Sequence, residues 1–317
     1  LGERWTLTLG GRLYDSEVGG KADMSGLLPA LQVGGGGAVD LSVKDKGFNP
    51  KAALVYQATD DVMFYGSASR GFQYGGVNIL LTALPGVDPT VPPTYKSSTL
   101  WNYELGFRSD WFDRTLRFDM TAFYIDWSDA QVTQGSKSGL STYVDNVASA
   151  TGKGLEAAFR YRFPIRGLSL STAASYIDTE SGSSFTDGAT GKVIPAGTQM
   201  PLAPKVQVSN VLAYSTLLGN WSFGSELLHS YQGTSYSTLS HAVKLNAYNT
   251  LGASFTVGRP DLPLEPSLTL LGDNLTNEHA IVYGVSSASG GIVAPVASTP
   301  FTYNRPRSIG LRLNIQF

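Results

Sequence analysis

Large apolar residues occupy every second position of the stretch Trp101-Asn102-Tyr103-Glu104-Leu105-Gly106-Phe107-Arg108. The stretches 155–163 and 308–317 show the same alternation. Because successive side chains of a β-strand point to opposite faces, each of these segments is predicted to form a strand with one apolar and one polar face.

Similar alternation predicts further strands near 3–14, 49–58, 62–72, 114–126, 167–179, 203–216, 221–232, 243–257 and 266–275. The sequence thus predicts about twelve strands, most of them about ten residues long or longer, whereas strands of globular proteins have a mode of about 5–6 residues. A strand of about ten residues that is tilted by about 45° crosses the hydrocarbon core of a bilayer.

The predicted connections alternate between short and long. The short ones are 59–61, 112–114, 164–166, 217–220 and 258–265, and the long ones are about 15–46, 73–98, 127–142, 180–202, 233–242 and 276–304. This series is typical of a transmembrane barrel, in which the tight turns lie on one side of the membrane and the long loops on the other.

Aromatic residues are expected to form two belts at the membrane–water interfaces. Trp111, Phe112, Phe163, Trp221 and Phe317 lie at the short-turn ends, and Trp101, Tyr124, Trp127, Tyr176 and Tyr231 lie near the long-loop ends. The polar face carries charges that are costly in lipid, so we expect it to point inward. These charged residues are Glu104, Arg108, Arg117, Asp119, Glu156, Arg160, Arg162 and Arg312.

The composition agrees with a barrel. The 317 residues include 15% charged residues, against about 25% in average soluble domains, and no cysteine. The net charge of −2 argues against a nucleic-acid partner. No apolar run reaches the roughly 18 residues of a transmembrane helix. We therefore predict an all-β, antiparallel, up-and-down transmembrane β-barrel that forms a single domain over 1–317.

Several motifs, in order along the chain, resemble the C-terminal barrel of TonB-dependent outer-membrane receptors. They are the strand and turn over 49–61, the segment Phe64–Phe72 with Gly75-Gly76-Val77-Asn78, the pair 101–106 and 123–127, the strand start Gly154-Leu155-Glu156, the motif Asp273-Asn274-Leu275-Thr276-Asn277, and Arg305-Pro306-Arg307 with terminal Phe317. Each motif alone is weak, but their order and spacing cover nearly the whole chain.

The resemblance implies a barrel of about 22 strands, filled by an N-terminal plug that contacts TonB. It also implies a place in the lipid of a bacterial cell outer membrane and uptake of a scarce ligand such as a ferric siderophore. Phe317 is then the signal that the outer-membrane insertion machinery reads. The chain opens at Leu1 without a signal peptide or plug. We therefore expect a fragment, the last twelve strands of such a receptor. Alternatively, the twelve strands close on themselves.

Candidate ligand-binding residues lie in the predicted long loops. They are Tyr74, Tyr95, Tyr236, His241, His279 and Tyr283. Tyrosine can stack on an organic ligand and hydrogen-bond to it, and imidazole can contact an iron-bearing one. The alternative is that these side chains only pack the loops or anchor the interface. His229 is expected at the same end of the barrel.

No HExxH, GxSxG or GxxxxGK[ST] motif occurs, so the sequence predicts no enzyme and no cofactor. Two other functions stay open. One is a twelve-stranded autotransporter-type secretion pore. The other is an outer-membrane hydrolase with Ser286 or Ser287 beside His279, although no acid partner or oxyanion donor is visible.

Overall fold

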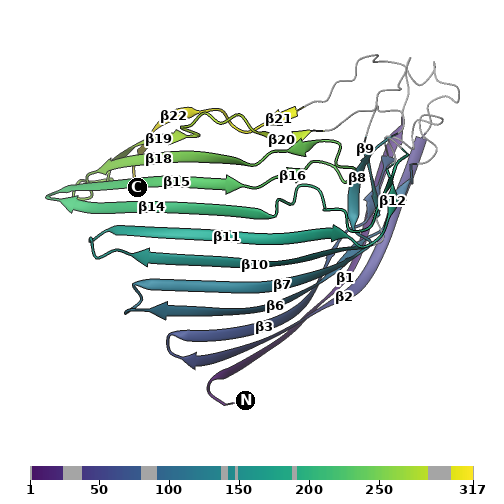
Figure 1. Ribbon diagram of the computed structural model, residues 1–317, viewed down its shortest axis with the longest axis horizontal. Coiled ribbons are helices and arrows are strands. Elements are labelled where there is room, and N and C mark those ends of the chain that lie inside the picture. Colours follow the sequence, from purple (N-terminus) through teal and green to yellow (C-terminus); the bar gives the residue numbers. More distant parts are fainter. Residues whose placement is uncertain are drawn as a thin grey trace.

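The computed structural model describes residues 2–23, 38–79, 91–136, 142–146, 149–187, 191–284 and 301–316. One twelve-stranded antiparallel sheet, here called the wall, dominates it (Figure 1). The wall consists of β1 (Trp5–Asp23), β2 (Ala38–Thr59), β3 (Val62–Gln73), β6 (Ser98–Trp111), β7 (Leu116–Ser128), β10 (Ser149–Arg162), β11 (Leu168–Ser181), β14 (Val206–Leu218), β15 (Trp221–Gln232), β18 (Tyr248–Gly258), β19 (Ser267–Asp273) and β22 (Ser308–Asn314). The predicted fold class and the count of about twelve strands are confirmed.

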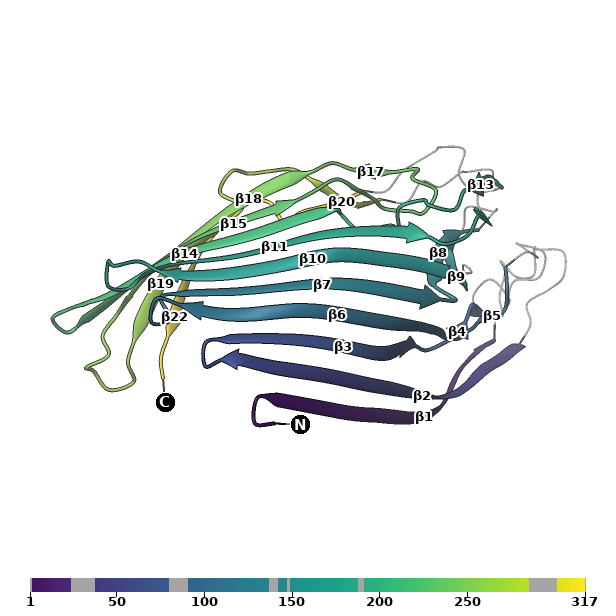
Figure 2. The same ribbon diagram turned by 60° about the horizontal axis from the view of Figure 1, so that its bottom comes forward.

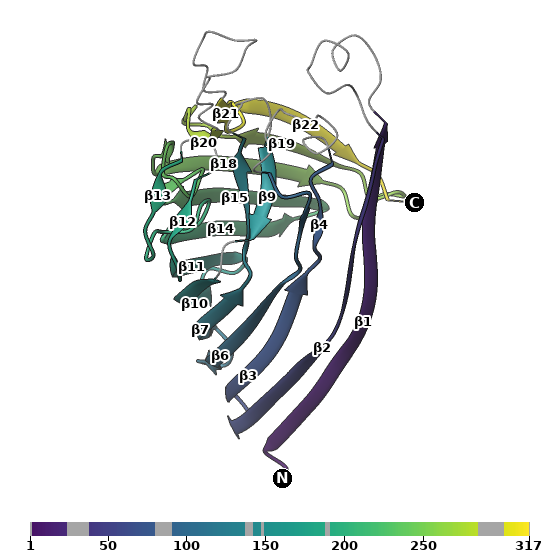
Figure 3. The ribbon, with the colours of Figure 1, turned by 90° about the vertical axis from the view of Figure 1, so that its right-hand side faces the viewer.

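Each wall strand pairs with the wall strands that precede and follow it in the chain, apart from the two edge strands, so the sheet is a simple meander. The sheet bends into an open trough (Figures 2 and 3). Its edges are β1 and β22, and no ladder joins these two strands within the described residues.

The connections sort by length as predicted. Short turns at 60–61, 112–115, 163–167, 219–220 and 259–266 lie at one end of the trough, and the long connections lie at the other (Figure 1). The first long connection, 24–37, is outside the described residues. In the turn after β6, Phe112, Asp113 and Arg114 all have positive φ, which lets the chain reverse in four residues.

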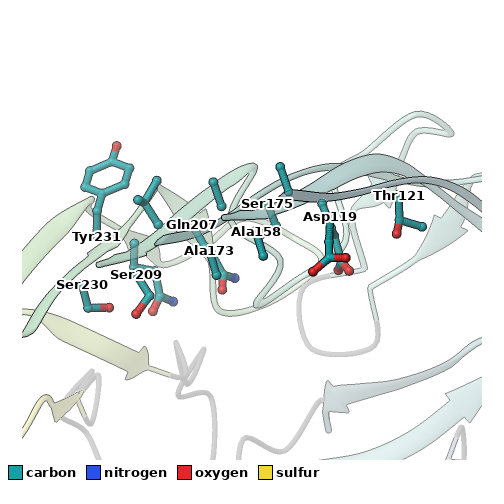
Figure 4. Close-up of a pocket in the computed structure, with 14 residues that line it drawn as sticks. Asp119, Thr121, Ala158, Ala173, Ser175, Gln207, Ser209, Ser230 and Tyr231 are labelled. Carbon is teal, nitrogen blue, oxygen red and sulfur yellow. The ribbon is translucent and has the colours of Figure 1, made fainter. Parts of the chain in front are cut away.

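The two faces of the wall follow the predicted alternation. Leu9, Leu13 and Leu105 are 72%, 82% and 69% exposed on the outer face, as expected for side chains that lipid would cover. The inner face forms shallow hollows, one of about 390 Å³ lined by Asp119, Glu156, Ser175, Gln207, Ser209 and Ser230. Figure 4 shows Tyr231 pointing away from the side that Ser230, Ser209 and Asp119 share.

Two strands are longer than predicted. The β1–β2 ladder continues beyond 3–14 and 49–58 as far as the pair Asp23–Ala38. The sequence predicts a loop over 15–46, although Val39, Leu41 and Val43 alternate there with polar residues. Exposed ion pairs, Lys44–Glu17 at 3.4 Å and Lys21–Asp40 at 2.7 Å, lie across the two strands. Cross-strand pairs of opposite charge suit a ladder that stands in water.

Glycines admit aromatic rings on the inner face. Tyr65 lies over Gly106, where a Cβ would approach the Tyr65 ring to 2.6 Å, and its hydroxyl hydrogen-bonds Thr121 at 2.6 Å. Gly154 makes room for Phe123 in the same way, since its Cβ would approach Phe123 Cζ to 2.7 Å. Each ring thus spans a neighbouring strand and fixes the register of the wall.

Beyond the long-loop end lies a second region, here called the cap, which comprises the segments that connect the wall strands at this end. Within the described residues it contains ten short strands that pair into five hairpins. They are β4 (Gly76–Val77) with β5 (Thr94–Tyr95), β8 (Gln131–Gly135) with β9 (Thr142–Asn146), β12 (Phe185–Thr186) with β13 (Val193–Ile194), β16 (Ser235–Tyr236) with β17 (Lys244–Leu245), and β20 (Ile281–Gly284) with β21 (Phe301–Tyr303). The predicted strand 243–257 includes β17, but as part of the wall strand that begins at Tyr248. The sequence does not predict the other short strands, because two to five residues are too few to show a period.

Candidate functional site

All six predicted ligand-binding residues lie in the cap. Tyr74 directly follows β3, Tyr95 is on β5, Tyr236 is on β16, and Tyr283 is on β20. His241 lies between β16 and β17, and His279 lies between β19 and β20. The structure distributes them over several groups of contacts rather than one pocket.

Tyr236 and His241 form one of these groups. Their rings stack with centroids 3.7 Å apart and an interplanar angle of 4°. His241 has a φ of 55°, which places its ring back over β16, and its Nε2 lies 3.0 Å from the carbonyl oxygen of Gln199. The pair therefore joins the β16–β17 hairpin to the segment before β14.

Tyr283 borders a hollow of about 250 Å³ in the cap. The hollow is lined by Gln131, Val132, Thr133, Gln134, Gly135, Thr142, Pro201, Leu202, Ser237, Thr238 and Tyr283. These residues come from the β8–β9, β13–β14, β16–β17 and β20–β21 regions, and none of them carries a charge. Such a surface suits an uncharged part of a ligand that has hydrogen-bonding groups and a flat ring.

Tyr74 belongs to a separate aromatic group. Phe72 stacks on Tyr14 at 3.8 Å between centroids, and Tyr74 meets Phe72 edge-on at 4.9 Å. The carbonyl oxygen of Tyr74 accepts a hydrogen bond of 2.8 Å from the side chain of Gln131. Tyr74 is 45% exposed, so part of its ring is free to meet a ligand.

Tyr95 and His279 make local contacts. The Tyr95 ring covers Gly76, where any Cβ would collide with it. The Nε2 of His279 lies 3.1 Å from the Nδ2 of Asn277. These contacts match the packing alternative for both residues.

The Asp273–Asn277 motif is a structural turn. Asn274 is 6% exposed with a φ of 48°, and its Nδ2 donates to the carbonyl oxygens of Glu278 and Arg305, each at 2.9 Å. Its Oδ1 accepts from the Glu278 backbone N–H at 2.9 Å. One side chain therefore ties the β19–β20 connection to the segment that enters β22.

Sequence reasoning missed the core of the cap. Ala130, Val132, Ala150, Met200 and Leu239 form a buried cluster, with Trp127 and Phe185 packed against it. Trp127 was expected in the upper aromatic belt, and that prediction is wrong, because the cap supplies a dry surface for its ring. Apolar residues scattered over three connections and the start of β10 carry no periodic signal.

Side-chain amides join neighbouring hairpins of the cap. Asn78 Nδ2 donates to the carbonyl oxygen of Val144 at 2.8 Å, and the backbone N–H of Val144 donates back to Asn78 Oδ1 at 3.0 Å. Asn146 exchanges a similar pair of bonds with the backbone of Lys96, at 2.8 and 3.1 Å. The β4–β5 and β8–β9 hairpins are thereby held together.

His229 is not part of the cap. It lies on β15 opposite Asn210, on the outer face of the wall, and its ring nitrogens lie 3.0 Å from Asn210 Nδ2 and 3.0 Å from Asn249 Oδ1. Both nitrogens are thus occupied by neighbouring strands, so His229 is not a ligand candidate. Ser286, Ser287 and Phe317 lie outside the described residues.

The described part of the chain contains no group of three or more His, Cys, Asp or Glu side chains placed to hold a metal ion. No helix in the same part has the length and hydropathy needed to span a membrane.

An apolar outer face, a polar inner face and a folded cap at one end define the wall of a transmembrane β-barrel of the outer-membrane type. The TonB-dependent receptor-like β-barrel family matches residues 1–275, and the chain belongs to this family. The family consists of transport receptors rather than enzymes.

Solved receptor structures share the fold. The ferric yersiniabactin uptake receptor FyuA from Yersinia pestis matches 100% of this chain and 44% of its own with a TM-score of 0.74 and 18% identity. The siderophore receptor PiuA from Acinetobacter baumannii matches 98% of this chain and 41% of its own, with a TM-score of 0.68 and 18% identity. The copper transporter OprC matches 100% of this chain and 46% of its own, with a TM-score of 0.66 and 14% identity. The chain spans less than half the length of each of them.

Proposed function

We propose that the chain is the barrel wall and cap of a receptor for energy-coupled, TonB-dependent uptake of a scarce ligand, with a ferric siderophore or similar iron complex as that ligand. The observation that carries the proposal is the family match over residues 1–275 on a wall with an apolar outer and a polar inner face. FyuA is an uptake receptor for ferric yersiniabactin and PiuA is a siderophore receptor, which supports the choice of ligand class.

The proposed receptor has further partners. A polypeptide plug fills the lumen and TonB drives it, both through sequence beyond this chain. The outer leaflet and inner leaflet lipids of a Gram-negative outer membrane cover the apolar face, and the insertion machinery reads Phe317. Within this scheme the wall described here is the C-terminal part of a larger barrel.

The cap is the proposed place of first contact with the ligand. Tyr283 and the uncharged hollow beside it would hold an organic part of the complex, while the exposed part of Tyr74 offers a second aromatic surface. We assign Tyr236, His241, Tyr95 and His279 a supporting role, because their rings or nitrogens already contact neighbouring segments.

The experiment is uptake by cells that carry the intact receptor as their sole route for a panel of radiolabelled ferric siderophores, with and without an energised TonB system. TonB-dependent accumulation of one complex is the expected result. Since OprC is a copper transporter, a copper salt belongs in the panel. Copper uptake without iron uptake would replace the ligand class, and no TonB dependence would overturn the proposal.

Site variants refine the test. Tyr283→Ala should weaken equilibrium binding of the accepted complex to purified receptor, because the hollow loses its aromatic border. Tyr95→Phe is the matched control, since the phenyl ring still covers Gly76. Equal loss in both variants, or in neither, would remove Tyr283 from the ligand site.

A further inference from the structure

Three arginines gather on the inner face at the short-turn end of β10. Arg160 and Arg162 are on successive inward positions of the strand, and Arg166 follows in the turn to β11. They line a hollow of about 550 Å³ together with Ser169, Ser171 and Glu226, and all three are exposed.

On the preceding strands β6 and β7, the inward arginines are paired with carboxylates. Arg108 Nε lies 2.6 Å from Asp119 Oδ1. Arg117 donates to both carboxylate oxygens of Asp110, at 2.8 and 2.7 Å. On β6 and β7 each inward arginine thus has a carboxylate on the paired strand.

No such compensation occurs around β10. Within the described residues none of Arg160, Arg162 and Arg166 forms an ion pair, and the side-chain hydrogen bond of Arg160 goes to the Ser171 hydroxyl at 3.3 Å. The register places Arg160 directly opposite Arg117, a like charge that is unfavourable at this distance. Glu226 is the one carboxylate that lines this hollow, and in the described part of the chain it forms no ion pair with the three arginines. Asp119 lines a neighbouring hollow with Arg160, but it is paired with Arg108.

Resting on the proposed function, we infer that Arg160, Arg162 and Arg166 dock an acidic surface of the polypeptide that fills the barrel. Guanidinium groups bind carboxylates in two-pronged hydrogen bonds, so unpaired arginines on an inner wall fit an acidic partner.

The spacing of the charges favours a polypeptide over a small anion. Arg160 and Arg162 are about 7 Å apart along the strand, and Arg166 lies further around the turn. One small carboxylate can engage one guanidinium fork, whereas a segment with several carboxylates can engage all three. A resident segment also compensates the charges permanently, which a passing solute does not.

The experiment uses the intact receptor in planar lipid bilayers and measures the urea concentration at which the filling segment leaves and a large conductance opens. The variant with Arg160→Gln, Arg162→Gln and Arg166→Gln should open at lower urea, with the open fraction at a fixed low urea raised about tenfold or more. The matched control with all three arginines changed to lysine keeps the charge and should stay near the wild type.

Salt provides a second readout. Raising NaCl should lower the opening midpoint of the wild type and of the lysine variant, but leave the glutamine variant nearly unchanged, because screening acts on the same charges. Heat-modifiable mobility confirms that each barrel is folded.

The outcomes separate the two proposals. Equal urea dependence of the wild type and the glutamine variant would overturn the docking surface alone. Closure that depends on added citrate, lost in the glutamine variant, would assign the arginines to a dissolved anion and also overturn it. A wild-type receptor that conducts without urea would overturn the filled barrel of the proposed function, and the docking surface with it.

Discussion

The wall and the cap place their apolar side chains in opposite ways. On the wall, large apolar side chains such as Leu105 and Ile309 are 69% and 73% exposed on the outer face. In the cap they are inside. Every buried hydrophobic residue of the described chain lies at the long-loop end, namely Val91, Ala130, Val132, Tyr143, Ala150, Ile194, Met200, Leu239, Val243, Leu245 and Ala280.

The difference is the one expected when one region of a chain faces lipid and another region faces water. The wall needs lipid to cover its apolar face, and its backbone ladder satisfies the polar groups that lipid cannot. The cap stands in water and is held by a small dry core, as a soluble domain is. Substitutions that are harmless in one region should therefore be harmful in the other.

The largest effect is expected for a charge on the lipid face. Leu212 is at the middle of β14, so Leu212→Arg in the intact receptor should lower the free energy of unfolding by about 2–4 kcal/mol. Ser209→Arg, on the same strand but facing the inner hollow, should cost far less. Urea unfolding in lipid vesicles measures both, and equal losses would show that the faces are assigned wrongly.

The next effect concerns the junction between cap and wall. Asn274→Ala removes the side chain that satisfies the backbone of Glu278 and Arg305, so we expect a loss of about 1–3 kcal/mol as buried polar groups lose their partner. The loss should be local. Hydrogen exchange should rise at 277–280 and 304–307 while the middle of the wall keeps its protection. Unchanged exchange there would mean that Asn274 is dispensable.

A smaller effect tests the core of the cap. Val132 is 5% exposed, and Val132→Ala deletes two carbons, which should destabilise the cap by about 1–2 kcal/mol at about 0.8 kcal/mol per buried carbon group. Proteolysis of the β8–β9 hairpin should become faster, with the barrel still folded. Val208→Ala on the outer face is the control. If both variants were equally resistant, the cluster around Val132 would not be a stabilising core.

The wall was predictable because its strict period of two can be recognised residue by residue in the sequence. Leu105 and Glu104 fall on the faces expected of them, and so do all the inward charges from Glu104 to Arg312. The cap was not predictable because its contacts join residues far apart in sequence. Nothing in the sequence around Val132 or Met200 shows that they meet, and the same is true of Tyr236, whose partner His241 depends on a positive φ.

The candidate site was likewise predictable only in part. The end of the barrel at which Tyr74, Tyr236 and Tyr283 lie followed from loop length alone. Which of them borders a hollow and which packs against a glycine or a neighbouring ring depends on the folded loops. The unpaired state of Arg160 and Arg162 likewise requires the register of four strands, since the sequence does not say that Asp110 and Asp119 are already engaged.

The smallest effect belongs to the short-turn end, which has neither lipid nor a core to hold it. In the turn 259–266, Arg259 donates to both oxygens of Asp261 at 2.8 and 2.9 Å, and Asn220 Nδ2 donates to the same carboxylate at 2.9 Å. These hydrogen bonds, chiefly that from Arg259, lower the pKa of Asp261 from 3.8 to about 2. A lowered pKa means that the contact contributes fully above pH 3.8 and is lost as the pH falls toward 2.

The Arg259 guanidinium also lies 4.9 Å from the centre of the Trp221 ring, so Trp221 reports on the turn. Between pH 7 and about 4 the fluorescence of Trp221 should be constant, and below that it should change with a midpoint near the lowered pKa as the protonated carboxyl releases Arg259. Asp261→Asn should abolish this transition while the wall stays folded, because the Arg259–Asp261 pair lies within the turn. A transition of the same size in the variant would show that Trp221 senses another group. The turn would then be held by its backbone bonds alone, such as that from the Arg259 N–H to the Pro266 carbonyl oxygen at 2.9 Å.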